Sequence, residues 1–285
     1  MYSREITRCH RTAIVIAIDQ SSSMSGQIEL NGESLSKADA VAMVTGRLIE
    51  ELIMRSYSGD TYRYYYDVAI VGYSDNRVYS LLGENNGFYP ITLLATQKRS
   101  QISYKLPYNT LNGGVSTFYE RVPMWVEPRA EGNTPMCMML NSVTDLVGAW
   151  CAKRDNRDSF PPIVINITDG EASDADYDML RAAASRLKAT GTRDGATLLV
   201  NVHISSSNQQ IPIIFPTVAE MTDELRYANV LMEISSVVPE PFNDYVCSCR
   251  SEFAEAPYIA MSYNASISEL IAMLNIGTRS SRVGI

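Results

Sequence analysis

The sequence Thr12-Ala-Ile-Val-Ile-Ala-Ile-Asp19-Gln-Ser21-Ser-Ser23 joins an unbroken apolar run to an acidic and hydroxyl-rich end. A run of this kind, rich in β-branched residues, is typical of a strand that is buried on both faces of a parallel sheet. Its polar residues come at the carboxyl end, where open α/β sheets hold their ligands. We therefore predict a central strand from about Thr12 to Asp19, followed by a loop that carries the function.

The side chains of Asp19, Ser21 and Ser23 occupy alternate positions in this loop. In a tight loop their oxygen atoms can all face one point. Hard oxygen ligands, without nitrogen or sulfur, favour Mg²⁺, Mn²⁺ or Ca²⁺ over zinc or copper. The loop is therefore a candidate for one half of a divalent-cation site.

A second buried strand, Pro162-Ile-Val-Ile-Asn-Ile-Thr-Asp169-Gly170, also ends in an aspartate. In a doubly wound sheet of strand order 3-2-1-4-5-6 the first and fourth strands are neighbours, so Asp19 and Asp169 would meet at the carboxyl edge. Thr134 precedes Pro135, which favours the start of a helix at that same edge. Each motif is common in isolation, and the prediction depends on their combination. The predicted metal ligands are Asp19, Ser21, Ser23, Thr134 and Asp169.

The rest of the chain alternates between strand-like and helix-like segments. This alternation predicts an α/β fold with a doubly wound, mostly parallel sheet, helices on both faces in a Rossmann-like arrangement, and one antiparallel edge strand at 76–82. Ser36, with Asp39 three residues later, is expected to cap the first helix. The expected helices are 34–55, 136–153, 175–190, 217–238 and 266–276, and the expected strands are 12–19, 62–73, 76–82, 162–170, 196–204 and 258–263.

The chain shows no internal repeat and no linker, so residues 1–285 are predicted to form one domain. An insertion is expected at about 83–131, with short strands or helical turns of its own, because an unstructured loop of that length is unusual in a compact domain. Within it, 117–126 is expected to be a strand that leads back into the main sheet. Residues 25–32 and 239–257 are expected to be irregular, and 278–285 to form a short polar tail.

Length and composition exclude several classes of protein. A chain of 285 residues with 46% apolar content can bury a large core. The net charge of −8 argues against nucleic acid as a partner. No run of about 18 apolar residues is present to span a membrane, and no apolar leader precedes the first strand, so we expect a cytoplasmic protein. The cysteines are five in number and form no C-x-x-C pairs, so neither a disulfide framework nor a zinc site is expected.

With these motifs in place, the chain resembles the von Willebrand factor type A family. The metal-ion-dependent adhesion site of that family combines Asp-x-Ser-x-Ser after the first strand, a threonine, and an aspartate after the fourth strand. All five positions match here, and the resemblance covers roughly residues 11–276. The sequences Trp125-Val-Glu-Pro, Gly132-Asn-Thr-Pro-Met136 and Ile167-Thr-Asp-Gly-Glu171 are similar to the intracellular bacterial branch, which includes the tellurite-resistance TerY-type proteins.

The resemblance implies a protein-binding adaptor and not an enzyme. It implies that Ser21, Ser23 and sometimes Thr134 bind the cation directly, while the carboxylates act partly through water. An open position on the cation would accept an Asp or Glu from a partner protein. TerY-type proteins tend to be linked with protein kinases and phosphatases, so the partner is expected in such a stress or signalling system. Hydrogen bonds that adjust the ligands are expected from Gln20, Ser22 and Thr168.

Two other functions stay open at this stage. The same cation could activate water in a phosphoester hydrolase, which would need a general base nearby. Glu171 and Asp174 are the evident candidates for that base, although an acidic rim is their simpler interpretation. Alternatively, the cation could serve a scaffold and only hold the loops in place.

Overall fold

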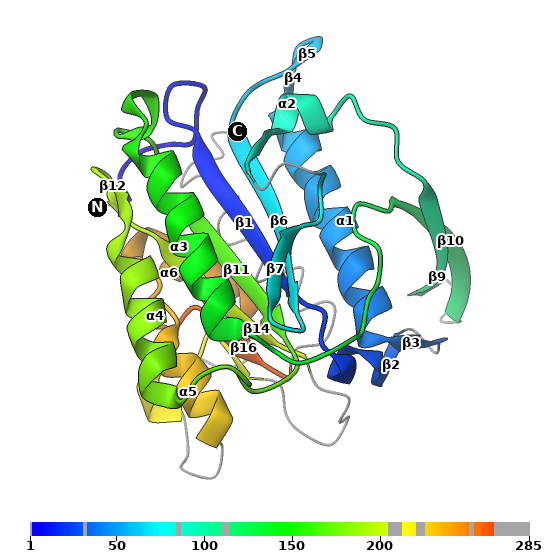
Figure 1. The fold of residues 1–285 in the computed structure, drawn as a ribbon. Helices are drawn as coiled ribbons and strands as arrows, with labels where there is room; N and C mark the ends of the chain where they lie inside the picture. The colour runs from blue at the N-terminus through cyan, green and yellow to red at the C-terminus, as the bar shows by residue number, and fades with distance from the viewer. Residues whose placement is uncertain are drawn as a thin grey trace.

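The structure is a computed structural model that describes residues 2–30, 33–83, 87–109, 115–204, 213–220, 226–250 and 254–264. Within these residues the centre of the molecule is an eight-stranded sheet with helices on both faces (Figure 1). Its strands are β1 (Thr12–Asp19), β6 (Tyr66–Ser74), β7 (Arg77–Ser80), β8 (Tyr89–Pro90), β11 (Ile163–Thr168), β14 (Leu198–His203), β15 (Ile213–Ile214) and β16 (Met261–Tyr263).

The strand order is β15-β16-β14-β11-β1-β6-β7. β8 also pairs with β6, near its N-terminal end at Asp67 and Val68. β1 runs parallel to both of its neighbours, β6 and β11, and β14 and β16 continue the parallel part of the sheet. β7 and β8 are antiparallel to β6, and β15 is antiparallel to β16. The order of β7, β6, β1, β11, β14 and β16 is the predicted 3-2-1-4-5-6, which confirms the doubly wound α/β fold.

The core consists of two layers, one on each face of the sheet. In β1, Ile14, Ile16 and Ile18 pack into the layer that holds α1, whereas the alternate residues Ala13 and Val15 pack into the layer of α3, α4 and α5. Because every residue of β1 is buried, the unbroken apolar run is explained by contact with helices on both sides. The helices are α1 (Lys37–Ser56), α2 (Ile91–Leu94), α3 (Met136–Ala152), α4 (Tyr177–Ala189), α5 (Arg226–Ile234) and α6 (Asn243–Cys249).

Four small hairpins and four short 3₁₀ turns complete the described residues. The hairpins are β2–β3 (Gln27–Leu30 with Glu33–Ser36), β4–β5 (Tyr57–Ser58 with Thr61–Tyr62), β9–β10 (Gln101–Asn109 with Val115–Pro123) and β12–β13 (Gly191–Thr192 with Gly195–Ala196). The 3₁₀ turns are η1 (Ser22–Ser25), η2 (Arg154–Asn156), η3 (Val218–Glu220) and η4 (Glu240–Phe242).

The insertion differs from its prediction in one respect. It does contain short strands and a helical turn, but β10 pairs with β9 alone and does not return to the main sheet. β7 and β8 already cover that edge of β6, so β10 packs against α1 instead (Figure 1). The approach is close, since a Cβ atom at Gly46 of α1 would lie 2.4 Å from the carbonyl oxygen of Pro123.

Three other segments were also predicted incorrectly or only in part. The predicted loop at 25–32 contains β2, because Gln27–Leu30 pairs with Glu33–Ser36. The segment 239–257, expected to be irregular, forms η4 and α6 in its first part. The helix expected at 217–238 begins as η3 and continues as α5, and 221–225 lie outside the described residues. The helix expected at 266–276 and the tail at 278–285 also lie outside the described residues.

None of the helices in the described residues combines the length and the apolar character that crossing a bilayer requires.

Candidate metal centre

Asp19 is the last residue of β1 and is fully buried. Its Oδ1 accepts a hydrogen bond from the backbone N–H of Ser21 at 2.9 Å, and its Oδ2 accepts one from Oγ1 of Thr168 at 2.7 Å. Thr168 ends β11, the parallel neighbour of β1. The sheet therefore brings together the ends of β1 and β11, strands one and four of the predicted order, and Thr168 donates to Asp19 as the sequence predicted.

The two serines join the loop after β1 to the loop after β11. Oγ of Ser21 lies 3.0 Å from Oγ of Ser23, and Oγ of Ser23 donates to Oδ1 of Asp169 at 2.5 Å. Ser23 belongs to the 3₁₀ turn η1, and Ser21 is the residue directly before that turn. Four of the five predicted residues are thus linked by hydrogen bonds that cross between the two strand ends.

Thr134 reaches the same place from the segment that precedes α3. Its backbone is fixed to Ser173, since the Thr134 N–H donates to Oγ of Ser173 at 3.0 Å and the Thr134 carbonyl accepts from the Ser173 N–H at 2.9 Å. Oγ1 of Thr134 and Oγ of Ser23 each lie 3.7 Å from the position that a Cβ atom at Gly170 would take. The structure therefore brings all five predicted residues to one point at the carboxyl edge of the sheet.

The ionised form of the Asp19 carboxyl is disfavoured because the side chain is buried. Burial raises the pKa of Asp19 to about 6, and repulsion from Asp169 adds to the effect. Hydrogen bonds from Ser21 and Thr168 act in the opposite direction. A bound cation would relieve this cost directly, because an opposite charge close by favours the ionised form of a carboxylate.

Lys37 is a residue of the site that sequence analysis missed. Its Nζ lies 2.8 Å from Oδ2 of Asp169, and the two side chains are 9% and 0% exposed. A signal was present in the sequence, because Lys37 is the first residue of a helix, where the macrodipole disfavours a positive charge. Asp169 thus accepts a hydrogen bond from Ser23 on Oδ1 and one from Lys37 on Oδ2.

The other predicted neighbours of the ligands lie elsewhere. Gln20 accepts from the hydroxyl of Tyr79 at 2.6 Å and so faces β7 and not the cluster. The backbone N–H of Ser22 donates to the carbonyl of Gly132 at 3.0 Å, while its side chain is exposed. Of the three expected neighbours, Thr168 is the one whose side chain donates to a predicted ligand, Asp19.

The acidic residues that follow Asp169 have other roles. Both oxygens of Asp174 accept hydrogen bonds from backbone N–H groups of the first turn of α3, at 3.1 Å from Cys137 and 2.8 Å from Met138. Asp174 therefore stabilises the helix N-terminus, where four N–H groups lack partners within the helix. Glu171 is exposed and accepts from the hydroxyl of Tyr177 at 3.3 Å.

His203 ends β14 and lies near the cluster, but its ring behaves as a core group. It stacks on Tyr263 with ring centroids 4.3 Å apart and an interplanar angle of 13°. Burial lowers the pKa of His203 to about 4, so the ring is neutral at physiological pH. His203 is therefore a core residue at the end of β14 and not a charged member of the cluster.

The donor set fits a hard divalent cation. In the described part of the chain, no three His, Cys, Asp or Glu side chains are grouped to hold a metal ion. The cluster offers instead two carboxylates and three hydroxyls, all of them oxygen donors. Mg²⁺ and Mn²⁺ accept such ligands and keep several water molecules. The ammonium of Lys37, which contacts Asp169, cannot serve as a metal ligand.

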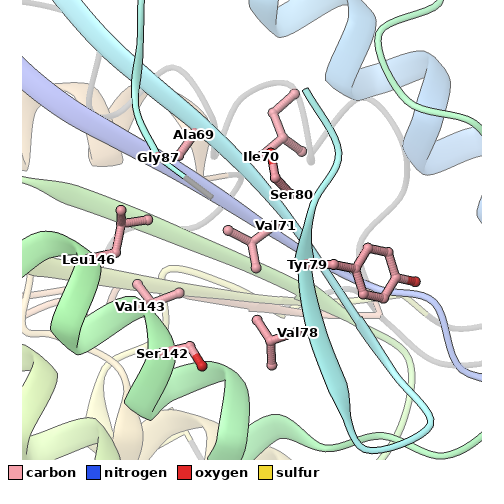
Figure 2. Close-up of a pocket in the computed structure, with 10 residues that line it drawn as sticks. All are labelled: Ala69, Ile70, Val71, Val78, Tyr79, Ser80, Gly87, Ser142, Val143 and Leu146. Carbon is pink, nitrogen blue, oxygen red and sulfur yellow. The ribbon is translucent and has the colours of Figure 1, made fainter. Parts of the chain in front are cut away.

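Two cavities that border β7 contain none of the five predicted ligands. One of about 130 Å³ is enclosed by β6, β7 and α3, and Figure 2 shows Val71, Val78 and Val143 on its wall. Its lining is largely apolar and also includes the hydroxyl residues Tyr79, Ser80 and Ser142. A larger one, of about 560 Å³, lies on the other side of β7 and is lined in part by Lys98, Arg99 and Arg129.

Comparison with known proteins does not assign the chain to a family, since no protein-family model and no curated protein matches it. Among solved structures it is similar to a von Willebrand factor type A protein from Catenulispora acidiphila, with 14% identity, a TM-score of 0.41, and coverage of 69% of this chain and 34% of that one. It is similar to proximal thread matrix protein 1 from the mussel byssus (15% identity, TM-score 0.48, 94% and 46% covered) and to the SpRpn10 VWA domain (12%, 0.37, 79% and 83%). This chain spans less than half of the length of the first two.

Proposed function

We propose that this chain is a metal-ion-dependent protein-binding module. Asp19, Asp169 and the three hydroxyls would hold one divalent cation, Mg²⁺ or Mn²⁺, and an open position on that cation would accept an Asp or Glu of a partner protein. The observation that supports the proposal most strongly is the convergence of Thr134 with Ser23 and Asp169, from three separate segments, on one point of the sheet edge. Hydroxyl ligands are neutral, so the cation would keep enough positive charge to attract a carboxylate.

The rest of the chain positions these ligands. Thr168 and the backbone of Ser21 fix the orientation of the Asp19 carboxylate, and Ser173 fixes the backbone of Thr134. Asp174 holds the first turn of α3, the helix that follows Thr134. Such supporting hydrogen bonds matter because a cation site works only when its ligands are held in place before the ion arrives.

The larger cavity supports a partner with acidic character. It carries Lys98, Arg99 and Arg129 together with one carboxylate, Glu127, on a chain whose net charge is −8. The guanidinium of Arg99 lies 4.6 Å above the centre of the Trp125 ring, which orients it. Tyr79 lines this cavity and donates to Gln20, so the cavity reaches the residue that follows Asp19 in the sequence. A partner that brings one carboxylate to the metal ion could therefore place other carboxylates against Lys98, Arg99 and Arg129.

The hydrolase alternative has no general base that an observation favours. Asp174 is engaged by the N-terminus of α3, and Glu171 is exposed on the rim. A screen of phosphoesters with Mg²⁺ and Mn²⁺ tests the alternative, and turnover that disappears in Asp169→Asn would overturn the adaptor proposal.

Removal of the cation is expected to release the partner. The immobilised protein, incubated with cell extract in Mg²⁺, should retain partners that EDTA elutes. Thr134→Ala should retain them at least about thirtyfold less well, because a central interface contact is worth about 2 kcal/mol or more. Thr144→Ala is the matched control, since Thr144 lies on α3 and its hydroxyl donates only within that helix, to the carbonyl of Leu140 at 2.7 Å.

Two outcomes decide this experiment. The proposal expects the same proteins, identified by mass spectrometry, on wild type and on Thr144→Ala in Mg²⁺, and their loss in EDTA and on Thr134→Ala. Equal retention with Mg²⁺ and with EDTA would overturn the metal-dependent role. A lower melting temperature in EDTA with unchanged retention would favour the scaffold alternative.

A further inference from the structure

Lys37 occupies a position in which a lysine is not expected. It is the first residue of α1, directly after the N-cap Ser36, whose hydroxyl accepts from the backbone N–H of Asp39 at 3.0 Å. The positive end of the helix dipole lies there, so anionic side chains are favoured and cations are disfavoured. The backbone N–H of Lys37 also donates to the carbonyl of Gly26 at 2.8 Å, which fixes the lysine to the loop that carries Ser21 and Ser23.

Asp169 is the group that compensates for this placement. The ammonium of Lys37 lies 2.8 Å from Oδ2 of Asp169, with both side chains almost fully removed from solvent. The other oxygen of Asp169 accepts from Ser23. A divalent cation that used Asp169 as a ligand, directly or through water, would have to share this carboxylate with the ammonium.

We propose that Lys37 competes with the divalent cation for Asp169, so that the chain carries its own counter-ion for the site. This inference rests on the proposed function, because both concern a cation at Asp169. With Lys37 in place, the charge of the cluster of Asp19, Asp169 and Lys37 is −1, whereas the two carboxylates alone carry −2. Cation affinity follows the charge of the ligands, and like charges at short range repel strongly where water is excluded. The cation therefore binds only as the ammonium leaves Asp169, which the flexible four-carbon stem of lysine allows.

A simpler role for Lys37 would be a tie between α1 and the end of β11. In that case its removal would destabilise the protein and leave cation affinity unchanged or weaker. Competition predicts the opposite sign, because removal of the ammonium leaves both carboxylates available to the cation. The direction of the change in affinity therefore separates the two roles.

The test uses Mn²⁺ as the probe, with free Mn²⁺ measured by electron paramagnetic resonance during titration of wild type, Lys37→Met and Lys37→Gln. Both variants are expected to bind Mn²⁺ at least about tenfold more tightly than wild type. The control is Lys153→Met, an exposed lysine after α3, which should bind as wild type does. Equal or weaker binding by the Lys37 variants would overturn the inference.

A second measurement needs no variant and covers the case in which the variants fold poorly. Brief acetylation of wild type, read by mass spectrometry, should modify Lys37 more in saturating Mg²⁺ than in EDTA, while Lys153 is modified equally in both. Unchanged protection of Lys37 would contradict the competition.

Failure of the inference and failure of the proposed function give different results. If wild type binds Mn²⁺ and the Lys37 variants bind it no more tightly, only the inference fails. If none of the proteins binds Mn²⁺, both the inference and the metal-dependent function fail. If the Lys37 variants bind Mn²⁺ more tightly but EDTA does not release partners, the inference stands and the adaptor role fails.

Discussion

Replacing Asp169 with alanine is expected to abolish Mn²⁺ binding and to lower the free energy of unfolding by about 3–5 kcal/mol. The stability loss comes from Lys37, whose ammonium loses its counter-charge and can regain solvent only by moving its stem out of a buried position. Urea denaturation followed by circular dichroism measures the stability, and the Mn²⁺ titration measures the binding.

The double variant Asp169→Ala/Lys37→Met separates these two effects. It should recover a large part of the stability lost in Asp169→Ala, because no unpaired charge is left. It should not recover Mn²⁺ binding, because a ligand is still missing. A double variant as unstable as Asp169→Ala would show that the two residues are not coupled.

Replacing Asp67 with alanine is expected to cost about 3–5 kcal/mol of unfolding free energy, without affecting the cation site. Asp67 is buried near the start of β6, at the end of the sheet away from the cluster. Its carboxylate accepts from the hydroxyl of Tyr64 at 2.5 Å and from Nε1 of Trp150 at 2.8 Å, and it pairs with Nε of Arg11 at 3.4 Å. Removal of the carboxylate would leave the buried indole N–H of Trp150 without its acceptor and would take a partner from the half-buried side chains of Tyr64 and Arg11.

The conservative variant Asp67→Asn is the control for this prediction. It keeps one acceptor oxygen and loses the charge, so its loss of stability should be smaller than that of Asp67→Ala. Urea denaturation of both variants measures the difference, and both should bind Mn²⁺ as wild type does. A loss below about 1 kcal/mol in Asp67→Ala would contradict the importance of this network.

The features that could be predicted are mainly those that depend on residues close together in the sequence. The apolar run Thr12–Asp19 matches β1 at both ends, because burial on both faces requires an unbroken run with a polar residue at each boundary. Ser36 caps α1 as predicted, since capping depends on a few adjacent residues. The positions of Asp19 and Asp169 at neighbouring strand ends followed from the order 3-2-1-4-5-6, which is one common order for a doubly wound sheet.

The features that could not be predicted depend on contacts between distant segments. Alternating residues at 115–123 indicate a strand but not its partner, and the partner is β9 because β7 and β8 cover the edge of the main sheet. Lys37 lies 132 residues from Asp169 in the sequence, and its long side chain could have turned toward solvent. Its contact with Asp169 is formed only in the folded structure, where the loops that follow β1 and β11 lie side by side.

Diffraction from crystals soaked in MnCl₂, measured near the manganese absorption edge, tests the central claim most directly. The account predicts one anomalous peak among the oxygens of Ser21, Ser23 and Thr134, beside Asp19 and Asp169, with the Lys37 ammonium moved away from Asp169. A map with no peak at that point at saturating Mn²⁺, and with Lys37 still in contact with Asp169, would contradict it.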